Sequence, residues 1–94
     1  MIMYFTYVLY SRKYDEIYIG QTNNLELRLE EHNSGMSKST KRYAPWEIIY
    51  TESFNSRSAA MKREKQLKSH SGRNFIRKEI LKNKFWMHSV LAQW

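Results

Sequence analysis

Apolar and aromatic positions gather in three short stretches that are separated by polar breaks. The stretches cover residues 4–11, 16–21 and 46–53, and each is rich in the β-branched and aromatic side chains typical of β-strands. The polar break between the first two is short, so we expect them to form an antiparallel hairpin. Gly20 ends the second strand, where the absence of a side chain permits a sharp turn or the close approach of another group.

The segment after the second strand has the longer period of a helix. An asparagine cap at position 23 or 24 predicts a helix over residues 25–33, and Gly35 fits its C-terminal end. The helical period places Leu25, Leu29 and His32 on one face, with Arg28 at its edge.

The third strand and the segment after it complete the fold. Strict alternation along the strand predicts two faces, one carrying Trp46, Ile48 and Tyr50 and the other Glu47, Ile49 and Thr51. Asn55 or Ser56 would cap a helix that runs to about Ser69, and Ser71 would cap a further helix through about Lys82. The order is therefore β-β-α-β-α-α, an α+β domain with a three-stranded antiparallel sheet flanked by helices.

One domain accounts for nearly the whole chain, because 94 residues allow a single core of modest size. We place this domain at residues 1–84. Residues 85–94 form an apolar tail, expected to be a short helix that packs on the core or on a second copy. We therefore expect a monomer or a weak homodimer.

Positive charge is concentrated in the second half of the chain. Residues 1–52 hold six Lys or Arg against seven Asp or Glu, whereas residues 53–94 hold ten against two. The net charge of +7 predicts a polyanionic partner, with nucleic acid favoured over an anionic membrane surface. A solvated lysine-rich surface without a partner would have the same composition.

The sequence also bears on the compartment. It contains no cysteine, whereas short secreted chains usually carry disulfides. No basic region precedes the first apolar run, which is short and rich in tyrosine, so a signal peptide is not expected, and no stretch is long enough to span a bilayer. We therefore expect a cytoplasmic protein that is not associated with a membrane.

Glu64 is the one acidic residue between Ser53 and Lys78, in a strongly basic segment. The spacing of Ala60, Glu64 and Leu67 puts them on one helix face, which we expect to be buried. Carboxylates are rarely buried without a partner. A hard divalent cation such as Mg²⁺, which needs few protein ligands, is one candidate partner. A salt bridge to a neighbouring lysine or arginine is the other.

Four further residues have side chains suited to phosphate chemistry. Arg28 and His32 lie one helical turn apart and can address one point, the first as a phosphate ligand and the second as a proton carrier. Tyr7 and Tyr18 lie on adjacent strands, and a phenol becomes a base when nearby cations favour its ionised form. Ordinary packing would explain each residue taken alone. Together with Glu64, they supply the parts of phosphodiester hydrolysis if they converge on one cleft.

The order and spacing of these residues resemble those of the GIY-YIG endonuclease family. The first tripeptide of the name is reduced here to Phe5-Thr6-Tyr7, and the second is intact as Tyr18-Ile19-Gly20. The family's arginine, its second-turn tyrosine or histidine and its metal-binding glutamate match Arg28, His32 and Glu64.

The resemblance covers about residues 2–82 and is strongest to small stand-alone bacterial members, which are similar to the N-terminal nuclease module of an excinuclease. It implies Mg²⁺- or Mn²⁺-dependent cleavage of DNA, with a role in DNA repair or recombination. Glu64 would bind the metal, and Tyr7 or Tyr18 would take the proton of the attacking water, with His32 as relay or alternative base. The late polar residue of the family corresponds best to Asn74.

One departure from the family concerns the cations near the site. Some members carry a lysine just after the second tripeptide, where this chain has Gln21.

Binding of the phosphate backbone without sequence preference is assigned to exposed cations, namely Lys38, Lys41, Arg42, Lys62, Lys65, Lys68, Arg73 and Arg77. The alternative function is a non-catalytic module that binds nucleic acid through the same cations and through stacking aromatic rings.

Overall fold

The computed structural model describes residues 2–82, and its strands and α-helices follow the predicted order, with a 3₁₀ turn in the predicted loop and a π-helical end to the third helix. Their bounds are β1 Tyr4–Ser11, β2 Glu16–Thr22, α1 Leu25–Asn33, the 3₁₀ turn η1 Lys41–Tyr43, β3 Glu47–Phe54, α2 Arg57–Lys68, α3 His70–Phe75 and the π-helical segment η2 Ile76–Leu81. The expected ends differ from these by at most two residues. The predicted apolar tail at 85–94 lies outside the described residues.

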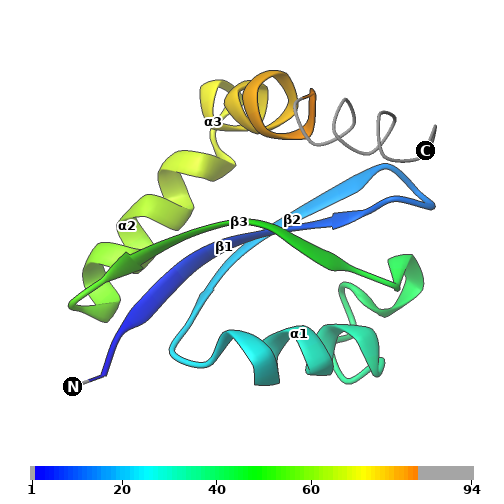
Figure 1. The fold of residues 1–94 in the computed structure, drawn as a ribbon, viewed down its shortest axis with the longest axis horizontal. Coiled ribbons are helices and arrows are strands. Elements are labelled where there is room, and N and C mark those ends of the chain that lie inside the picture. Colours follow the sequence, from blue (N-terminus) through cyan, green and yellow to red (C-terminus); the bar gives the residue numbers. More distant parts are fainter. Residues whose placement is uncertain (1, 83–94) are drawn as a thin grey trace, which may run out of the picture.

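Strand β1 is the centre of an antiparallel sheet with the order β2-β1-β3. Helix α1 lies on one side of this sheet, and α2 and α3 lie on the other (Figure 1). The predicted α+β class and the three-stranded antiparallel sheet are therefore confirmed. Because both faces are covered, every residue of β1 from Thr6 to Ser11 is buried.

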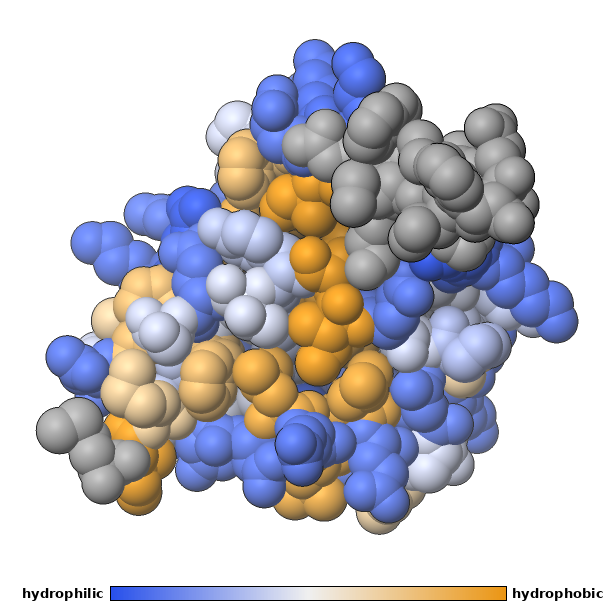
Figure 2. Space-filling model, in the orientation of Figure 1, coloured by the Kyte–Doolittle hydropathy of each residue, from blue (hydrophilic) through white to orange (hydrophobic). Residues whose placement is uncertain are grey.

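Alternation along β1 divides the apolar side chains between two cores. The core under α1 contains Tyr7, Leu9 and Trp46 as its buried members. The core under α2 and α3 is larger and contains Val8, Tyr10, Ile19, Leu67, Ile76 and Leu81. On the face shown in Figure 2, apolar side chains remain visible in a band across the middle of the molecule, with polar residues on both sides.

The predicted faces of the third strand are wrong in one respect. The pairing of β3 with β1 shifts by one residue, so that Leu9 lies opposite Ile48 but Val8 lies opposite Tyr50, with Ile49 as the extra residue of a β-bulge. Ile48 consequently packs in the core under α1, whereas Tyr50 packs in the core under α2. One inserted residue reverses which side chains face each core in the rest of the strand. No local pattern in the sequence predicts such a bulge.

The start of the third helix also differs from the prediction. Ser69, and not Ser71, is the N-cap of α3, and its side chain accepts a hydrogen bond from the backbone N–H of Gly72. Gly72 does not interrupt the helix. It lies where α3 approaches α2, and a Cβ atom added there would be 2.5 Å from the Cα atom of Leu67. The glycine is therefore required by the close contact between the two helices.

Replacing Gly72 by alanine should destabilise the protein, although alanine is ordinarily the better helix former. The added methyl group would overlap the backbone of α2, and overpacking of this kind costs about 1–3 kcal/mol. Urea unfolding measures the change. Ser71→Ala, an exposed position on the same turn, is the control and should change stability by no more than about 0.5 kcal/mol. A Gly72→Ala variant as stable as the wild type would contradict the close helix contact.

Candidate active site

The β1–β2 hairpin places two phenols on the face covered by α1. Tyr7 lies opposite Gly20 and Tyr18 lies opposite Leu9, with 6.3 Å between the two ring centroids. The Tyr7 side chain passes across Gly20, since a Cβ atom added at Gly20 would be 2.6 Å from the Tyr7 hydroxyl oxygen. The missing side chain thus lets the phenol of the central strand extend over the outer strand β2.

Helix α1 holds Arg28 and His32 against these phenols. The helix begins after Asn24, whose side chain accepts a backbone N–H of the first turn. Leu25 and Leu29 pack onto the sheet. His32 shares this inward face and is fully buried, whereas Arg28 lies at its edge and is half-buried.

Both ring nitrogens of His32 have hydrogen-bond partners. Nε2 lies 3.1 Å from the hydroxyl oxygen of Tyr7, and Nδ1 lies 2.7 Å from Oγ1 of Thr40. The ring centroid of Tyr18 is 4.7 Å from that of the imidazole. Burial, and then the positive charge of Arg28, lower the pKa of His32 to about 4, so the ring is neutral at neutral pH.

The Tyr7 phenol keeps its proton in this environment. Burial raises the pKa of Tyr7 to about 12. Among the smaller effects, hydrogen bonding to Arg28 and its charge lower the pKa, whereas the charges of Tyr18 and Glu64 raise it. The phenol therefore becomes a base only if its own proton has an acceptor or if more positive charge is brought near it.

The guanidinium of Arg28 is fixed in place and open to solvent. Its Nη1 atom donates to a carboxylate oxygen of Glu31 at 3.0 Å, and the Arg28 side chain remains 34% exposed. The hydrogen bond to Glu31 raises the pKa of Arg28, burial lowers it, and Tyr7 and Tyr18 raise it further. A charged, part-exposed guanidinium that faces two phenols is suited to binding the oxygens of a phosphate.

Glu64 approaches from the other side of the sheet, on α2. Thr6 fixes this helix, because its hydroxyl donates at 2.7 Å to the carbonyl oxygen of Ala60, one turn before Glu64. Ala60 and Leu67 are buried as predicted. Glu64 itself is 23% exposed at its side chain and accepts a hydrogen bond from the Lys68 ammonium at 2.6 Å. The salt bridge that the sequence left as an alternative is thus present.

Glu64 and Arg28 nevertheless both affect the pKa of Tyr7. The negative charge of Glu64 is one of the causes that raise the pKa of Tyr7. The Tyr7 phenol extends over β2, one of the strands on which α2 packs. The edge of β2 is therefore the place that residues from both helical layers can reach.

Glu64 fits a cation site with a single protein carboxylate. Residues 2–82 contain no group of three or more His, Cys, Asp or Glu side chains that could hold a metal ion. Mg²⁺ commonly binds through one or two carboxylates and keeps water or substrate phosphate as its other ligands. The Glu64 carboxylate, which is paired with the Lys68 ammonium, is partly exposed to solvent. It therefore offers oxygen ligands to such an ion and leaves room for its waters.

The remaining predicted site residues are exposed, and some are already engaged. Arg77 binds the side chain and the backbone carbonyl of Asp15 in the hairpin turn. Asn74 shares a hydrogen bond with His70 on α3, and within the described residues it makes none to the cluster around Arg28. The other predicted cations lie on the surface of η1 and the loop before it, α2 and α3, namely Lys38, Lys41, Arg42, Lys62, Lys65, Lys68 and Arg73.

Thr40 is a site residue that the sequence did not indicate. It is buried in the loop after α1, and its carbonyl oxygen accepts the indole N–H of Trp46 at 2.9 Å. A threonine in a polar loop, eight positions after His32, carries no periodic or motif signal. Only the folding of this loop against the sheet makes it a partner of the imidazole.

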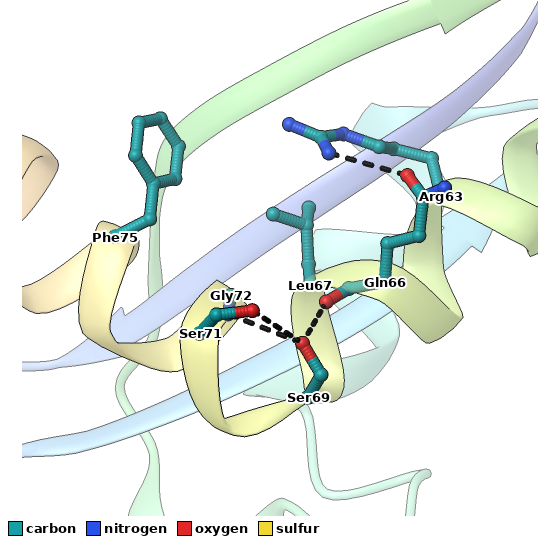
Figure 3. A pocket seen from close by; sticks show the side chains of 7 residues that line it. All are labelled: Arg63, Gln66, Leu67, Ser69, Ser71, Gly72 and Phe75. Atoms are coloured by element: carbon teal, nitrogen blue, oxygen red, sulfur yellow. Dashed lines mark hydrogen bonds between the residues drawn. The ribbon is translucent and has the colours of Figure 1, made fainter.

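A cleft of about 560 Å³ lies between α2 and α3, apart from the residues proposed for catalysis (Figure 3). Several of its polar side chains already have partners. Arg63 pairs with Glu52 at 2.8 Å, and the Ser69 hydroxyl donates to the carbonyl oxygen of Gln66 at 2.6 Å. The lining comprises Arg63, Gln66, Leu67, Ser69, Ser71, Gly72 and Phe75.

Comparison with known proteins places the chain in a family. The family model of the GIY-YIG catalytic domain matches residues 3–79. This chain therefore belongs to the GIY-YIG family of nuclease domains. Within it, the chain is 44% identical over 69 residues to a UPF0213 protein of Natronomonas pharaonis, an alignment that covers 72% of this chain and 80% of that protein.

Two further relatives have the same designation. A UPF0213 protein of Staphylococcus haemolyticus is 38% identical over 72 residues, which is 76% of this chain and 87% of that protein. The solution NMR structure of the UPF0213 protein BH0048 from Bacillus halodurans matches with 26% identity and a TM-score of 0.48, and covers 80% of this chain and 82% of that one.

The lowered pKa of His32 predicts a loss of stability in acid. The unfolded chain binds a proton near the ordinary pKa of 6.5 and the folded chain only near about 4, so stability is lost as the pH falls between these values. The full shift corresponds to about 3 kcal/mol. Urea unfolding at about pH 7 and about pH 4.5 should show a smaller acid loss in His32→Gln than in the wild type.

The control for this experiment is His70→Gln. His70 is exposed on α3, so this variant should keep the acid loss of the wild type. An equal acid loss in His32→Gln and in the wild type would show that the buried imidazole is not its source.

Proposed function

We propose that the protein is a divalent-metal-dependent endonuclease that hydrolyses phosphodiester bonds in DNA. The observation that supports this function best is the convergence at β2 of Arg28, His32 and two phenols, with Glu64 acting on Tyr7 from the opposite layer. A guanidinium, an imidazole, phenols and a carboxylate are the groups that neutralise, activate and transfer protons in phosphate hydrolysis.

Arg28 is the proposed ligand of the scissile phosphate. The ion pair with Glu31 holds the guanidinium in place and favours its charged form, and its exposed part can bind an anion from solvent. Hydrolysis builds up negative charge on the phosphate oxygens, and a fixed guanidinium stabilises that charge without having to reorganise. Arg28 would therefore stabilise the transition state more than it strengthens binding of the duplex.

The phenols and His32 are the proposed proton carriers. Tyr7 or Tyr18 would take the proton of the attacking water, and His32 lies within hydrogen-bond distance of Tyr7 as the next acceptor. A neutral imidazole is the form that can accept a proton, and burial keeps His32 in that form at neutral pH.

Glu64 would hold the divalent ion, Mg²⁺ or Mn²⁺. When bound, such an ion supplies positive charge to the phosphate oxygens and favours ionisation of nearby groups. Lys68 has to leave Glu64 for this to happen. Because a part-exposed lysine–glutamate pair one turn apart on a helix contributes only about 0.3–0.5 kcal/mol, the salt bridge is a weak competitor.

The exposed cations support DNA as the substrate. Lys62 and Lys65 are exposed on α2, the helix that carries Glu64, and further cations are exposed around η1, in the loop that holds Thr40. Basic residues thus lie on the two elements that contribute to the site from opposite layers. No helix among the described residues is long and apolar enough to cross a membrane. Preferential cutting of branched or damaged DNA would connect the protein to repair or recombination.

A non-catalytic module that binds nucleic acid is the second candidate. One observation favours it, namely that Glu64 is paired with Lys68, as a purely structural carboxylate would be. Such a module would keep the cations and aromatic rings for binding, but it would show no metal-dependent cleavage.

Glu64→Gln should abolish metal-dependent nicking while the fold survives, because the amide replaces the proposed anionic ligand with a neutral group of the same shape. The measurement is conversion of supercoiled DNA to the nicked form with Mg²⁺ or Mn²⁺, alongside urea unfolding. We expect a loss of at least about 100-fold in the rate. Glu26→Gln, at an exposed position in the first turn of α1, is the matched control and should cut like the wild type.

Two outcomes would contradict the proposal. Full activity in Glu64→Gln would refute the role of this carboxylate in metal binding. Absence of cleavage by the wild type on supercoiled and branched DNA with either metal would favour the non-catalytic module.

Binding to plain duplex should weaken steeply with salt, because contacts with phosphates release condensed counterions. Replacing both Lys62 and Lys65 by glutamine should reduce the slope of log K against log salt by about two. Fluorescence anisotropy without divalent metal measures the affinity. Lys13→Gln, in the hairpin turn, is the control. An affinity that barely changes between low and moderate salt would argue against this surface.

A further inference from the structure

Tyr7, His32 and Thr40 form a buried chain of hydrogen bonds that runs from the central strand, through α1, into the following loop. The contacts measure 3.1 Å from the phenol oxygen to Nε2 and 2.7 Å from Nδ1 to the Thr40 hydroxyl. Each of the three residues is at most 2% exposed. Solvent does not reach these three side chains. The neighbouring protein groups therefore determine which atom carries each hydrogen.

One arrangement of the hydrogens satisfies every group. The Tyr7 phenol also faces Arg28, which can only donate, so the phenol hydrogen goes to Nε2 of His32. A neutral imidazole then carries its single hydrogen on Nδ1, which donates to Oγ1 of Thr40. The Thr40 hydroxyl in turn donates to the carbonyl oxygen of Ser37 at 3.4 Å. Among the described residues, no buried side-chain nitrogen or oxygen lacks a partner.

The opposite tautomer leaves a hydrogen without an acceptor. If Nε2 of His32 carried the hydrogen and donated it to Tyr7, the phenol hydrogen would point toward the guanidinium of Arg28, which cannot accept it. The Thr40 hydroxyl would also have to turn from the Ser37 carbonyl oxygen to Nδ1. An unsatisfied buried hydroxyl costs more than a hydrogen bond gains, so this arrangement is disfavoured.

We propose that Thr40 is a positioning residue, which accepts the Nδ1 hydrogen of His32 and thereby leaves Nε2 free to receive the proton of Tyr7. Tyr7, and not Tyr18, is then the phenol that takes the proton of the attacking water. The assignment of the tautomer stands on the hydrogen bonds alone, whereas its catalytic consequence rests on the proposed nuclease function.

Tyr18 lacks the acceptor that this role requires. Its phenol interacts with the guanidinium of Arg28, which has no lone pair to offer, and its ring packs at a tilt of 58° on the imidazole. Within the described residues, no hydrogen bond joins its hydroxyl to a nitrogen or oxygen acceptor of another side chain. Tyr18 therefore packs beside the relay and does not pass a proton along it.

The proposed step moves two protons, one from the attacking water to Tyr7 and one from Tyr7 to His32. As the water oxygen bonds to phosphorus, its O–H bond breaks and the proton passes to the Tyr7 oxygen, while the phenol's own proton passes to Nε2 of His32. The bond from phosphorus to the leaving oxygen breaks, and that oxygen takes a proton from solvent. The imidazolium, held at Nδ1 by Thr40, then returns its proton to the Tyr7 oxygen as the phenol releases a proton to solvent. A phosphate at Arg28 offsets the positive charge that otherwise disfavours the imidazolium.

The experiment compares Thr40→Val with Thr40→Ser. Valine has nearly the shape of threonine but cannot accept the Nδ1 hydrogen, whereas serine keeps the hydroxyl. Nitrogen-15 NMR of the imidazole reads the tautomer directly. In the wild type and in Thr40→Ser we expect the hydrogen on Nδ1, and in Thr40→Val a shift of the population toward Nε2–H.

Nicking of supercoiled DNA supplies the second measurement. Thr40→Val should lower the rate by about ten-fold or more at equal amounts of folded protein, and Thr40→Ser should restore most of it. Tyr7→Phe should lose more activity than Tyr18→Phe, since only Tyr7 is connected to the relay. A merely structural role for Thr40 would change stability and leave the tautomer unchanged.

The proposal and the nuclease function can fail separately. A wild-type spectrum with the hydrogen on Nε2 would overturn the proposal, whether or not the protein cuts DNA. An unchanged tautomer and an unchanged rate in Thr40→Val would do the same. If the wild type cuts no DNA but its spectrum shows Nδ1–H that shifts in Thr40→Val, the positioning role stands and the nuclease function fails.

Discussion

The passage of the Tyr7 side chain across Gly20 is the contact on which the candidate site depends. Tyr7 belongs to the central strand, which is buried on both faces, and a phenol there would ordinarily be closed into the core. With no side chain at Gly20, the ring extends over the outer strand, and its hydroxyl reaches His32 and Arg28. A Cβ atom at position 20 would occupy the space of the hydroxyl, so the absence of a side chain there is what lets the buried phenol reach these partners.

Burial then sets the protonation state of each group. The same loss of solvent keeps the Tyr7 phenol protonated and the His32 imidazole neutral, because it penalises the charged form of each. Arg28 stays charged beside them because Glu31 holds it at the rim. The site therefore combines one fixed positive charge with a neutral donor and a neutral acceptor. Such a pair can pass a proton when a phosphate and a cation change the local charge.

The departure of the first tripeptide from the family name has a structural counterpart. Thr6 occupies a position in the central strand that an apolar residue would also fill, but its buried hydroxyl bonds to the carbonyl oxygen of Ala60. That carbonyl belongs to the helical turn ending at Glu64. This hydrogen bond thus connects the strand that carries Tyr7 directly to α2, the helix that carries the Glu64 carboxylate.

Local patterns along the chain are enough to predict the class of fold, the order of its elements and the face shared by Tyr7, Tyr18, Arg28 and His32, because strand alternation and helical period are local properties. Other features arise only when the chain folds. The bulge at Ile49 and the burial of Thr40 against His32 depend on how distant segments meet. The relation of Glu64 to both Tyr7 and Lys68 depends on where α2 crosses the sheet, and helical period predicts a face without predicting its neighbours.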